Sequence, residues 1–294
     1  MEKHTVSASL TDNTKYMNRA LPVKKSFDII ERNLIIGGQN SAFYFIDGFT
    51  KDETMLKLMD SFLNISADDM PEDATSFSTS CIPYVEVDIL GDFDSIFKNL
   101  LSGVTCLFID GYEAAIAIDC RTYPSRSIEE PDKDKSLRGS RDGFVETIVF
   151  NTALMRRRIR DPHLIMEMYE AGTSTRTDVA LCYMSDRVDR ELLTTIQNKL
   201  EESKSQDLKM SQQSLAESLF QRKWYNPFPK YKFTERPDTA CACLMEGKVI
   251  ILTDTSPSAL ILPTSIFDMI EEANDYYFCL LYTSPSPRDR SLSR

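Results

Sequence analysis

Residues 129–162 of this sequence read EEPDKDKSLRGSRDGFVETIVFNTALMRRRIRDP. The first part is a charged linker, and the second has apolar residues at helical spacing, which predicts a helix with one buried face. Asp142 is expected to cap this helix, because a carboxylate accepts hydrogen bonds from the N–H groups of the first turn, and Glu146 lies near the same positive end. Pro162 ends the helix, since proline disfavours helical backbone in the preceding residue.

Four arginines close the predicted helix, where cations complement the negative end of the helix dipole. Three interpretations are open: a solvated helix end, a nucleic-acid contact, or a contact with an acidic partner or an anionic lipid surface. The net charge of −11 disfavours nucleic acid. We expect these side chains to be exposed and available to another subunit or to a membrane surface: Arg156, Arg157, Arg158 and Arg160.

Trp224 and Tyr225 open a second notable stretch, which is rich in aromatic residues and proline. It is interpreted as a rigid loop packed on the core or, alternatively, as an interface, because aromatic residues are enriched where proteins meet. Both residues are therefore candidate contacts to a subunit or a membrane surface.

The composition is that of a globular protein, with 42% hydrophobic and 27% charged residues. No run of about 18 apolar residues occurs, so no spanning helix is predicted within this sequence. Seven cysteines lack any C-x-x-C pair, and His4 and His163 are the two histidines, which argues against a zinc site. Buried, reduced cysteines are expected, as in a cytoplasmic protein.

The predicted fold class is α/β, with two related α/β subdomains that have mixed sheets and are joined by a charged linker. The expected divisions are a flexible tail at 1–24, a first subdomain at 25–123, the linker at 124–141 and a second subdomain at 142–278. In the first half we expect strands at 34–38 and 41–48, a helix at 52–63, a polar loop at 66–80, a strand at 85–89, a helix at 92–102 and a hairpin at 104–120. In the second half we expect a strand at 178–184, helices at 186–201 and 211–220, and a hairpin of strands at 240–245 and 248–253.

The two halves repeat the same order of elements, which indicates an internal duplication. Asp47 and Asp186 follow equivalent strands, and Gly111 and Gly247 are placed in equivalent turns at a similar separation. The alternative is chance recurrence of a common order.

Residues 279–294 differ in kind from the rest and resemble the translation of a transposase-type sequencing adapter. The alternative is a native disordered tail rich in Ser, Pro and Arg. We expect the tail to be dispensable, and the native protein to continue past Phe278 into apolar segments of about 20 residues that span a membrane.

Motifs typical of enzymes are missing from the sequence, which has no G-x-S-x-G, no P-loop and no G-x-G-x-x-G after a strand. Acidic residues in the linker alternate with lysines and indicate a solvated surface. The sequence therefore predicts no catalytic residue, no cofactor and no metal.

Several motifs occur in order along the chain: RGSRDGFVE at 138–146, NTALMRRRIR at 151–160, YNPFP at 225–229, TERPD at 234–238 and ILPT at 261–264. Together they resemble the GerA family of spore germination proteins, the A subunits of nutrient germinant receptors. The resemblance covers roughly residues 27–278.

The resemblance implies a cytoplasmic N-terminal region, followed in the full-length protein by helices in the spore inner membrane. It implies the B and C subunits of the receptor as partners, an oligomer of this chain in the full complex, no nucleic acid and no catalytic site. In such a receptor, nutrient binding triggers ion release, and this region transmits or modulates the signal.

The central stretch is expected to form the joint between the subdomains. We expect Arg138 or Arg141 to pair with an acid or with backbone carbonyl groups across this joint, beside Asp142 and Glu146, because a guanidinium offers paired, planar donors. The rival hypothesis is a small-molecule binding module or an enzyme with its site in the cleft between the subdomains.

Overall fold

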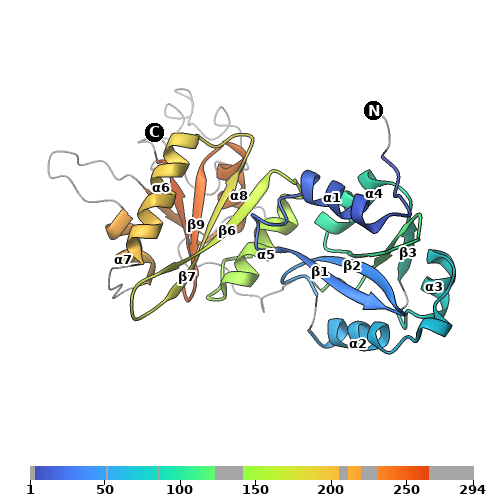
Figure 1. The fold of residues 1–294 in the computed structure, drawn as a ribbon. Coiled ribbons are helices and arrows are strands. Elements are labelled where there is room, and N and C mark those ends of the chain that lie inside the picture. Colours follow the sequence, from blue (N-terminus) through green and yellow to red (C-terminus); the bar gives the residue numbers. More distant parts are fainter. Residues whose placement is uncertain are drawn as a thin grey trace, which may run out of the picture. The chain divides into compact units, whose positions relative to one another are not determined.

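The computed structural model describes residues 4–50, 52–84, 86–122, 142–204, 211–219 and 231–264 (Figure 1). The chain divides into two compact units, one made of 1–125 with 152–168 and the other of 126–151 with 169–294. The division therefore differs from the predicted one, because 152–168 belongs with the first unit. The predicted linker at 124–141 lies outside the described residues, as do 279–294.

The first unit is built on a five-stranded sheet with the strand order β1-β2-β4-β5-β3. Its strands are β1 (Ile29–Ile36), β2 (Gln39–Ile46), β3 (Val87–Leu90), β4 (Thr105–Ile109) and β5 (Ala115–Ile118). Its helices are α1 (Leu10–Ala20), α2 (Asp52–Leu63), the short 3-10 helix η1 (Ala67–Asp69), α3 (Ala74–Ser80) and α4 (Phe93–Leu101).

Helices cover both faces of this sheet, α1 and α4 on one face and α2 and α3 on the other (Figure 1). Successive side chains of a strand point to opposite faces. Ala42 and Tyr44 of β2 therefore join the core under α1 and α4, whereas Phe43 joins the core under α2 and α3. Burial on both faces explains why residues 42–46 of β2 and 106–109 of β4 are continuous apolar runs rather than alternating ones.

The second half contains a second five-stranded sheet, with the strand order β6-β7-β9-β10-β8. Its strands are β6 (Leu164–Ala171), β7 (Thr177–Met184), β8 (Lys232–Thr234), β9 (Val249–Thr253) and β10 (Ala259–Leu262). Its helices are α5 (Ile148–Arg158), α6 (Arg190–Ser203), α7 (Ser211–Leu219) and α8 (Pro237–Met245).

The two sheets have the same topology, and the elements α1 to β5 and α5 to β10 follow one another in the same order apart from η1. We call these two segments the first and second repeats. The fold class of two related α/β subdomains is thus confirmed. Mixed sheets, with parallel and antiparallel strand pairs, were predicted. Every strand pair with a described register is antiparallel.

A buried asparagine occupies the same place in both repeats. Asn13 of α1 accepts a hydrogen bond from Ser7 N at 2.9 Å and donates to Ser7 O at 2.6 Å. Asn151 of α5 makes the same two bonds with Val145 N and O, at 2.8 and 2.6 Å. Because a buried amide must satisfy its polar atoms, each asparagine holds the backbone of the segment that precedes its helix.

The N-termini of these two helices are also held in the same way. Asp110, in the turn between β4 and β5, accepts from Leu10 N, and Asp254, in the turn after β9, accepts from Ile148 N. The prediction that Asp142 caps α5 is therefore wrong. The helix begins at Ile148, and its capping carboxylate comes from a distant turn.

The equivalent of Gly247 is Gly103 rather than Gly111. Both Gly103 and Gly247 follow the helix before the central hairpin and have a positive φ, at 100° and 89°. The predicted equivalence of Gly111 and Gly247 is wrong because residues 240–245 were predicted to form a strand, whereas they lie in α8. This helix is buried nearly all round, and periodicity does not separate such a helix from a buried strand.

Two segments that the sequence indicated to be irregular are helical. The predicted tail at 1–24 contains α1, in which Asn13 and Met17 are the buried residues, so its apolar periodicity is weak. The predicted loop at 66–80 contains α3, which starts after Asp73, whose side chain accepts from Ser76 N.

Candidate functional site

Two surface grooves lie in the first unit, one on each side of the edge strand β1. The α1 groove has a volume of about 560 Å³ and the α2 groove about 550 Å³. Both grooves use residues of β1: Glu31, Asn33, Leu34 and Ile35 line the α1 groove, and Arg32 lines the α2 groove.

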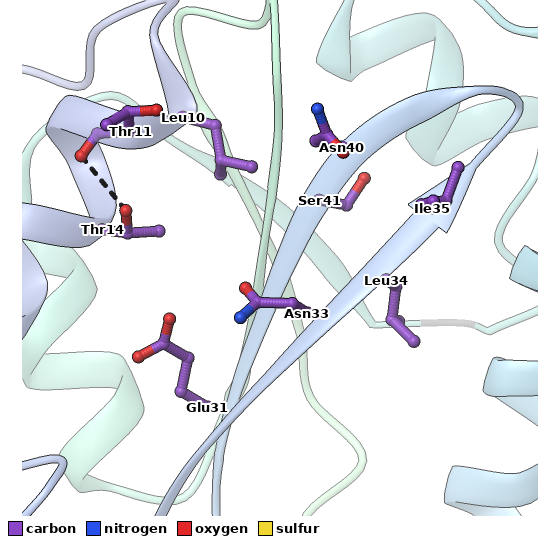
Figure 2. A pocket seen from close by; sticks show the side chains of 9 residues that line it. All are labelled: Leu10, Thr11, Thr14, Glu31, Asn33, Leu34, Ile35, Asn40 and Ser41. Carbon is purple, nitrogen blue, oxygen red and sulfur yellow. Dashed lines mark hydrogen bonds between the residues drawn. The ribbon is translucent and has the colours of Figure 1, made fainter.

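The α1 groove is polar and lies between α1 and the β1–β2 hairpin (Figure 2). The side chains of Glu31 and Asn33 extend from β1 toward α1, and Leu10 of α1 points toward the sheet. Its polar lining residues are Thr11, Thr14, Glu31, Asn33, Asn40 and Ser41.

The α2 groove is largely apolar and is lined by residues of α2 and by Arg32 of β1. Leu56 and Leu63 are among its lining residues, and they are 71% and 58% exposed. Glu53 and Asp60 also line it, together with Arg32.

The described residues contain no group of three or more His, Cys, Asp or Glu side chains placed to hold a metal ion. Cys106 is fully buried, and burial raises the pKa of its thiol to about 12. The thiol therefore stays protonated at neutral pH and is unsuited to act as a nucleophile.

Of the predicted joint residues, Asp142 is half-buried and Glu146 is exposed, and both precede α5. The carbonyl oxygen of Glu146 accepts from Thr255 N at 2.7 Å. Arg138 and Arg141 lie outside the described residues, as do Trp224 and Tyr225.

The predicted arginine cluster is not uniform. Arg157 and Arg160 are exposed and Arg158 is half-buried, but the side chain of Arg156 is completely buried. The expectation that Arg156 is exposed and available to another subunit is therefore wrong. Arg156 follows Ile148 and Thr152 at spacings of one helical turn, so it lies on the buried stripe of α5.

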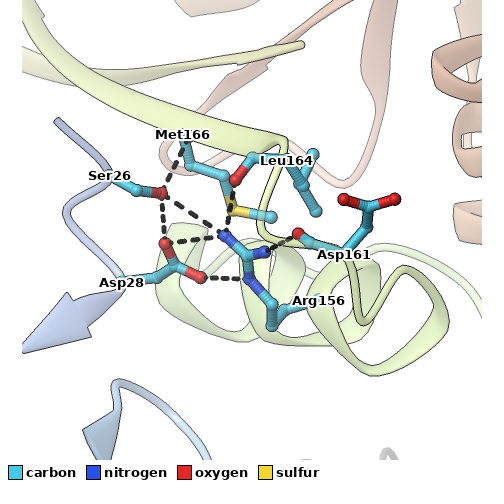
Figure 3. Close-up of polar contacts among 6 residues, drawn as sticks. All are labelled: Ser26, Asp28, Arg156, Asp161, Leu164 and Met166. Carbon is cyan, nitrogen blue, oxygen red and sulfur yellow. Dashed lines mark hydrogen bonds and ion pairs between the residues drawn. The ribbon is translucent and has the colours of Figure 1, made fainter. Parts of the chain in front are cut away.

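Arg156 is held by a buried polar network inside the first unit (Figure 3). Its Nε donates to Asp28 Oδ2 at 2.6 Å and its Nη2 donates to Asp28 Oδ1 at 3.2 Å. Nη1 donates to Asp161 O at 3.1 Å and Nη2 to Leu164 O at 3.0 Å. Planar paired donors of this kind are what distinguish arginine from lysine at such a site.

Ser26 completes the network. Its hydroxyl donates to Asp28 Oδ1 at 2.5 Å and accepts from Met166 N at 3.0 Å. The backbone bond from Phe27 N to Met166 O, at 3.0 Å, lies beside it. The network thus ties the segment before β1 to the end of α5 and the start of β6. Sequence reasoning missed Ser26 and Asp28, because nothing in the sequence around them indicates that they contact a residue far along the chain.

A second buried arginine lies at the start of α8. Arg236 is completely buried and donates to both carboxylate oxygens of Asp238, at 3.1 and 2.6 Å. Both buried arginines fall in motifs that carried the family resemblance, at 151–160 and 234–238. In both motifs, therefore, the arginine makes buried polar contacts inside the protein.

Comparison with known proteins settles the family. Residues 15–286 match the family described as Bacillus/Clostridium GerA spore germination protein. This chain belongs to the GerA family.

Three relatives of this GerA-family chain are named sporulation or spore germination proteins. Stage V sporulation protein AF of Bacillus subtilis is 34% identical over 276 residues, which cover 94% of this chain and 56% of that protein. Spore germination protein KA of Bacillus subtilis is 29% identical over 276 residues, covering 92% and 50%. Spore germination protein GerLA of Bacillus cereus is 30% identical over 255 residues, covering 85% and 51%. The chain thus spans about half the length of these relatives.

A solved structure has the same fold. The crystal structure of the N-terminal domain of the A subunit of the Bacillus megaterium spore germinant receptor GerK3 is similar with a TM-score of 0.66 and 23% identity. The match covers 90% of this GerA-family chain and 99% of that domain.

Proposed function

We propose that this chain is the N-terminal region of a spore germinant receptor A subunit and takes part in nutrient-triggered germination signalling and ion release. The observation that carries the proposal is the family match over residues 15–286, and the likeness to the GerK3 A-subunit domain supports it. The function is that of a receptor component, without catalysis.

The proposed partners are the B and C subunits of the receptor, with further copies of this chain in the full complex. Relatives named spore germination proteins, such as B1 of Bacillus subtilis, support a place in such a complex. Arg157 and Arg160 are exposed and remain the proposed contacts to another subunit or to an anionic membrane surface. Arg156 is excluded from this role by its burial.

The proposed location is the spore inner membrane, with this region facing the cytoplasm. Within the described ranges, no helix has the length and apolar character needed to cross a bilayer. One relative, YfkQ of Bacillus subtilis, is named a membrane protein, and it is matched over 52% of its length. In this proposal the spanning segments belong to the part of the protein outside this chain.

Signalling by such a complex requires a ligand that binds two conformations with different affinity. We assign nutrient binding to the complex as a whole and the transmission of the change to this region.

The test is an in-frame deletion of residues 15–264 in the encoding organism. The mutant spores should form in normal numbers, lose the response to at least one nutrient, and still germinate with a nutrient-independent trigger. The readout is the fall in optical density of a spore suspension. A normal response to every nutrient that wild-type spores recognise would overturn the proposal.

A second candidate function is a role in spore formation. It is favoured by the 34% identity to stage V sporulation protein AF, compared with 29% for spore germination protein KA. The same deletion distinguishes the role in spore formation from the role in germination. Fewer or defective spores, with a normal nutrient response in those that form, would favour the sporulation role.

A further inference from the structure

We propose that the α1 groove binds a small organic molecule that carries a protonated amine, with Glu31 as its counter-ion. The groove lies between α1 and the β1–β2 hairpin, and the carboxylate of Glu31 and the amide of Asn33 extend into it (Figure 2). Its volume of about 560 Å³ falls in the range of ligand sites in proteins. The proposal goes beyond the receptor role and does not depend on it.

Glu31 and Tyr44 lie side by side on this face of the sheet. Glu31 is half-buried and makes no ion pair within the described ranges. Tyr44 is its cross-strand neighbour and is completely buried, and burial together with the charge and hydrogen bonding of Glu31 raises the pKa of the Tyr44 hydroxyl. Directly paired residues of antiparallel strands share a face of the sheet. A carboxylate that has a neutral hydroxyl beside it and no ion pair among the described residues keeps its negative charge, which the ammonium group of a ligand would neutralise.

The second repeat shows that the fold does not require this polar surface. When β1 and β6 are aligned end to end, the position of Glu31 is taken by Met166 and that of Asn33 by Met168. The same alignment of β2 with β7 places Val179 at the position of Ser41. Met166 and Val179 are completely buried, whereas Met168 is 38% exposed. The half-buried carboxylate of Glu31 thus has no counterpart at the equivalent position of the second repeat.

The lining determines the charge of the ligand. The groove has one carboxylate, Glu31, and no lysine, arginine or histidine among its lining residues. An anion would find no cation there, whereas an ammonium group gains a charge-assisted hydrogen bond to Glu31. Asn33 and Asn40 offer donors and acceptors to hydroxyl groups, and Leu10 contacts the carbon chain.

The test uses three probes that share a linear polyol chain and differ in charge at one end: N-methylglucamine (cation), sorbitol (neutral) and gluconate (anion). Their binding to the purified chain is measured by isothermal titration calorimetry. N-methylglucamine should bind saturably and about tenfold or more tightly than sorbitol, because a hydrogen bond to a charged group is worth that much. Gluconate should not bind. Equal binding of the three probes, or no saturable binding of N-methylglucamine, would overturn the proposal.

Glu31→Gln should abolish the preference for the cation over sorbitol, whereas the matched control Glu53→Gln, in the α2 groove, should leave it unchanged. Asn33→Leu provides an independent variant at an exposed position and should weaken all binding to the groove. Thermal unfolding followed by circular dichroism verifies that each variant is folded. Retention of the cation preference in a folded Glu31→Gln variant would refute the role of Glu31. If that variant does not fold, unchanged N-methylglucamine binding in Asn33→Leu would refute the site.

Discussion

The Nε atom of Arg156 donates to Oδ2 of Asp28 at 2.6 Å, although the two residues are 128 positions apart in the sequence. Both side chains are buried, with 0% and 2% exposure. A buried ion pair is compensated only when further hydrogen bonds satisfy both partners, and Ser26 and two backbone carbonyl groups do so here.

Arg156→Met should lower the free energy of unfolding by about 3–5 kcal/mol, because it leaves the Asp28 carboxylate buried without a partner. Arg160→Met is the matched control and should change it by less than about 0.5 kcal/mol, since Arg160 is exposed. Urea denaturation followed by circular dichroism measures both.

The double variant Asp28→Leu with Arg156→Met should lose less free energy of unfolding than the sum of the losses in the two single variants, because it removes both charges together. Additive losses would show that the pair is not coupled in the folded protein.

Asn13→Ala and Asn151→Ala should each lower the free energy of unfolding by about 1–3 kcal/mol. Each change leaves a backbone N–H and a backbone C=O without the hydrogen bond that the amide side chain makes in the folded protein. The two losses should be similar, since the bonds are the same in both repeats. Asn198→Ala, at an exposed position of α6, is the control and should be neutral. A large loss at one asparagine and none at the other would contradict the equivalence.

Tyr44→Phe should change the free energy of unfolding by less than about 1 kcal/mol, because the buried hydroxyl makes no hydrogen bond of normal geometry to a described residue and interacts with the neighbouring Glu31 carboxylate. Tyr112→Phe is the contrasting variant. The hydroxyl of Tyr112 donates to Pro71 O, so its loss should cost about 1 kcal/mol. The same denaturation experiment compares them, and a loss in Tyr44→Phe as large as that in Tyr112→Phe would show that the Tyr44 hydroxyl is fully bonded to Glu31 in the folded protein.

The Arg121 guanidinium, which donates to Asp119 through Nε at 2.6 Å, holds the pKa of the Asp119 carboxyl below its usual value. A pKa that is lower in the folded state stabilises the protein above the unfolded pKa of about 3.9, and this stability is lost as the pH falls through the folded value. Arg121→Gln should therefore reduce the loss of stability below about pH 4. Unfolding free energies measured across that range test this, and identical pH profiles for both proteins would refute it.

Local elements were determined by the sequence alone wherever pattern and boundary signals agreed. The helix predicted at 52–63 is α2, and the one predicted at 92–102 is α4, for which Asp92 supplies the cap. The hairpin predicted at 104–120 is β4 and β5. Periodicity, capping carboxylates and glycine turns act within a few residues, so they can be read without knowledge of the fold.

Tertiary structure decided what depends on distant partners. Arg156 and Arg160 are the same residue type four positions apart, but Arg156 is buried against Asp28 and backbone carbonyl groups, whereas Arg160 is exposed. Glu31 and Tyr44 become neighbours only through the register of β1 and β2. Likewise, α5 begins at Ile148 because Asp254 reaches its first N–H group from another turn. Burying a polar group costs free energy unless a partner is supplied, and in this chain the partners come from residues far away in the sequence.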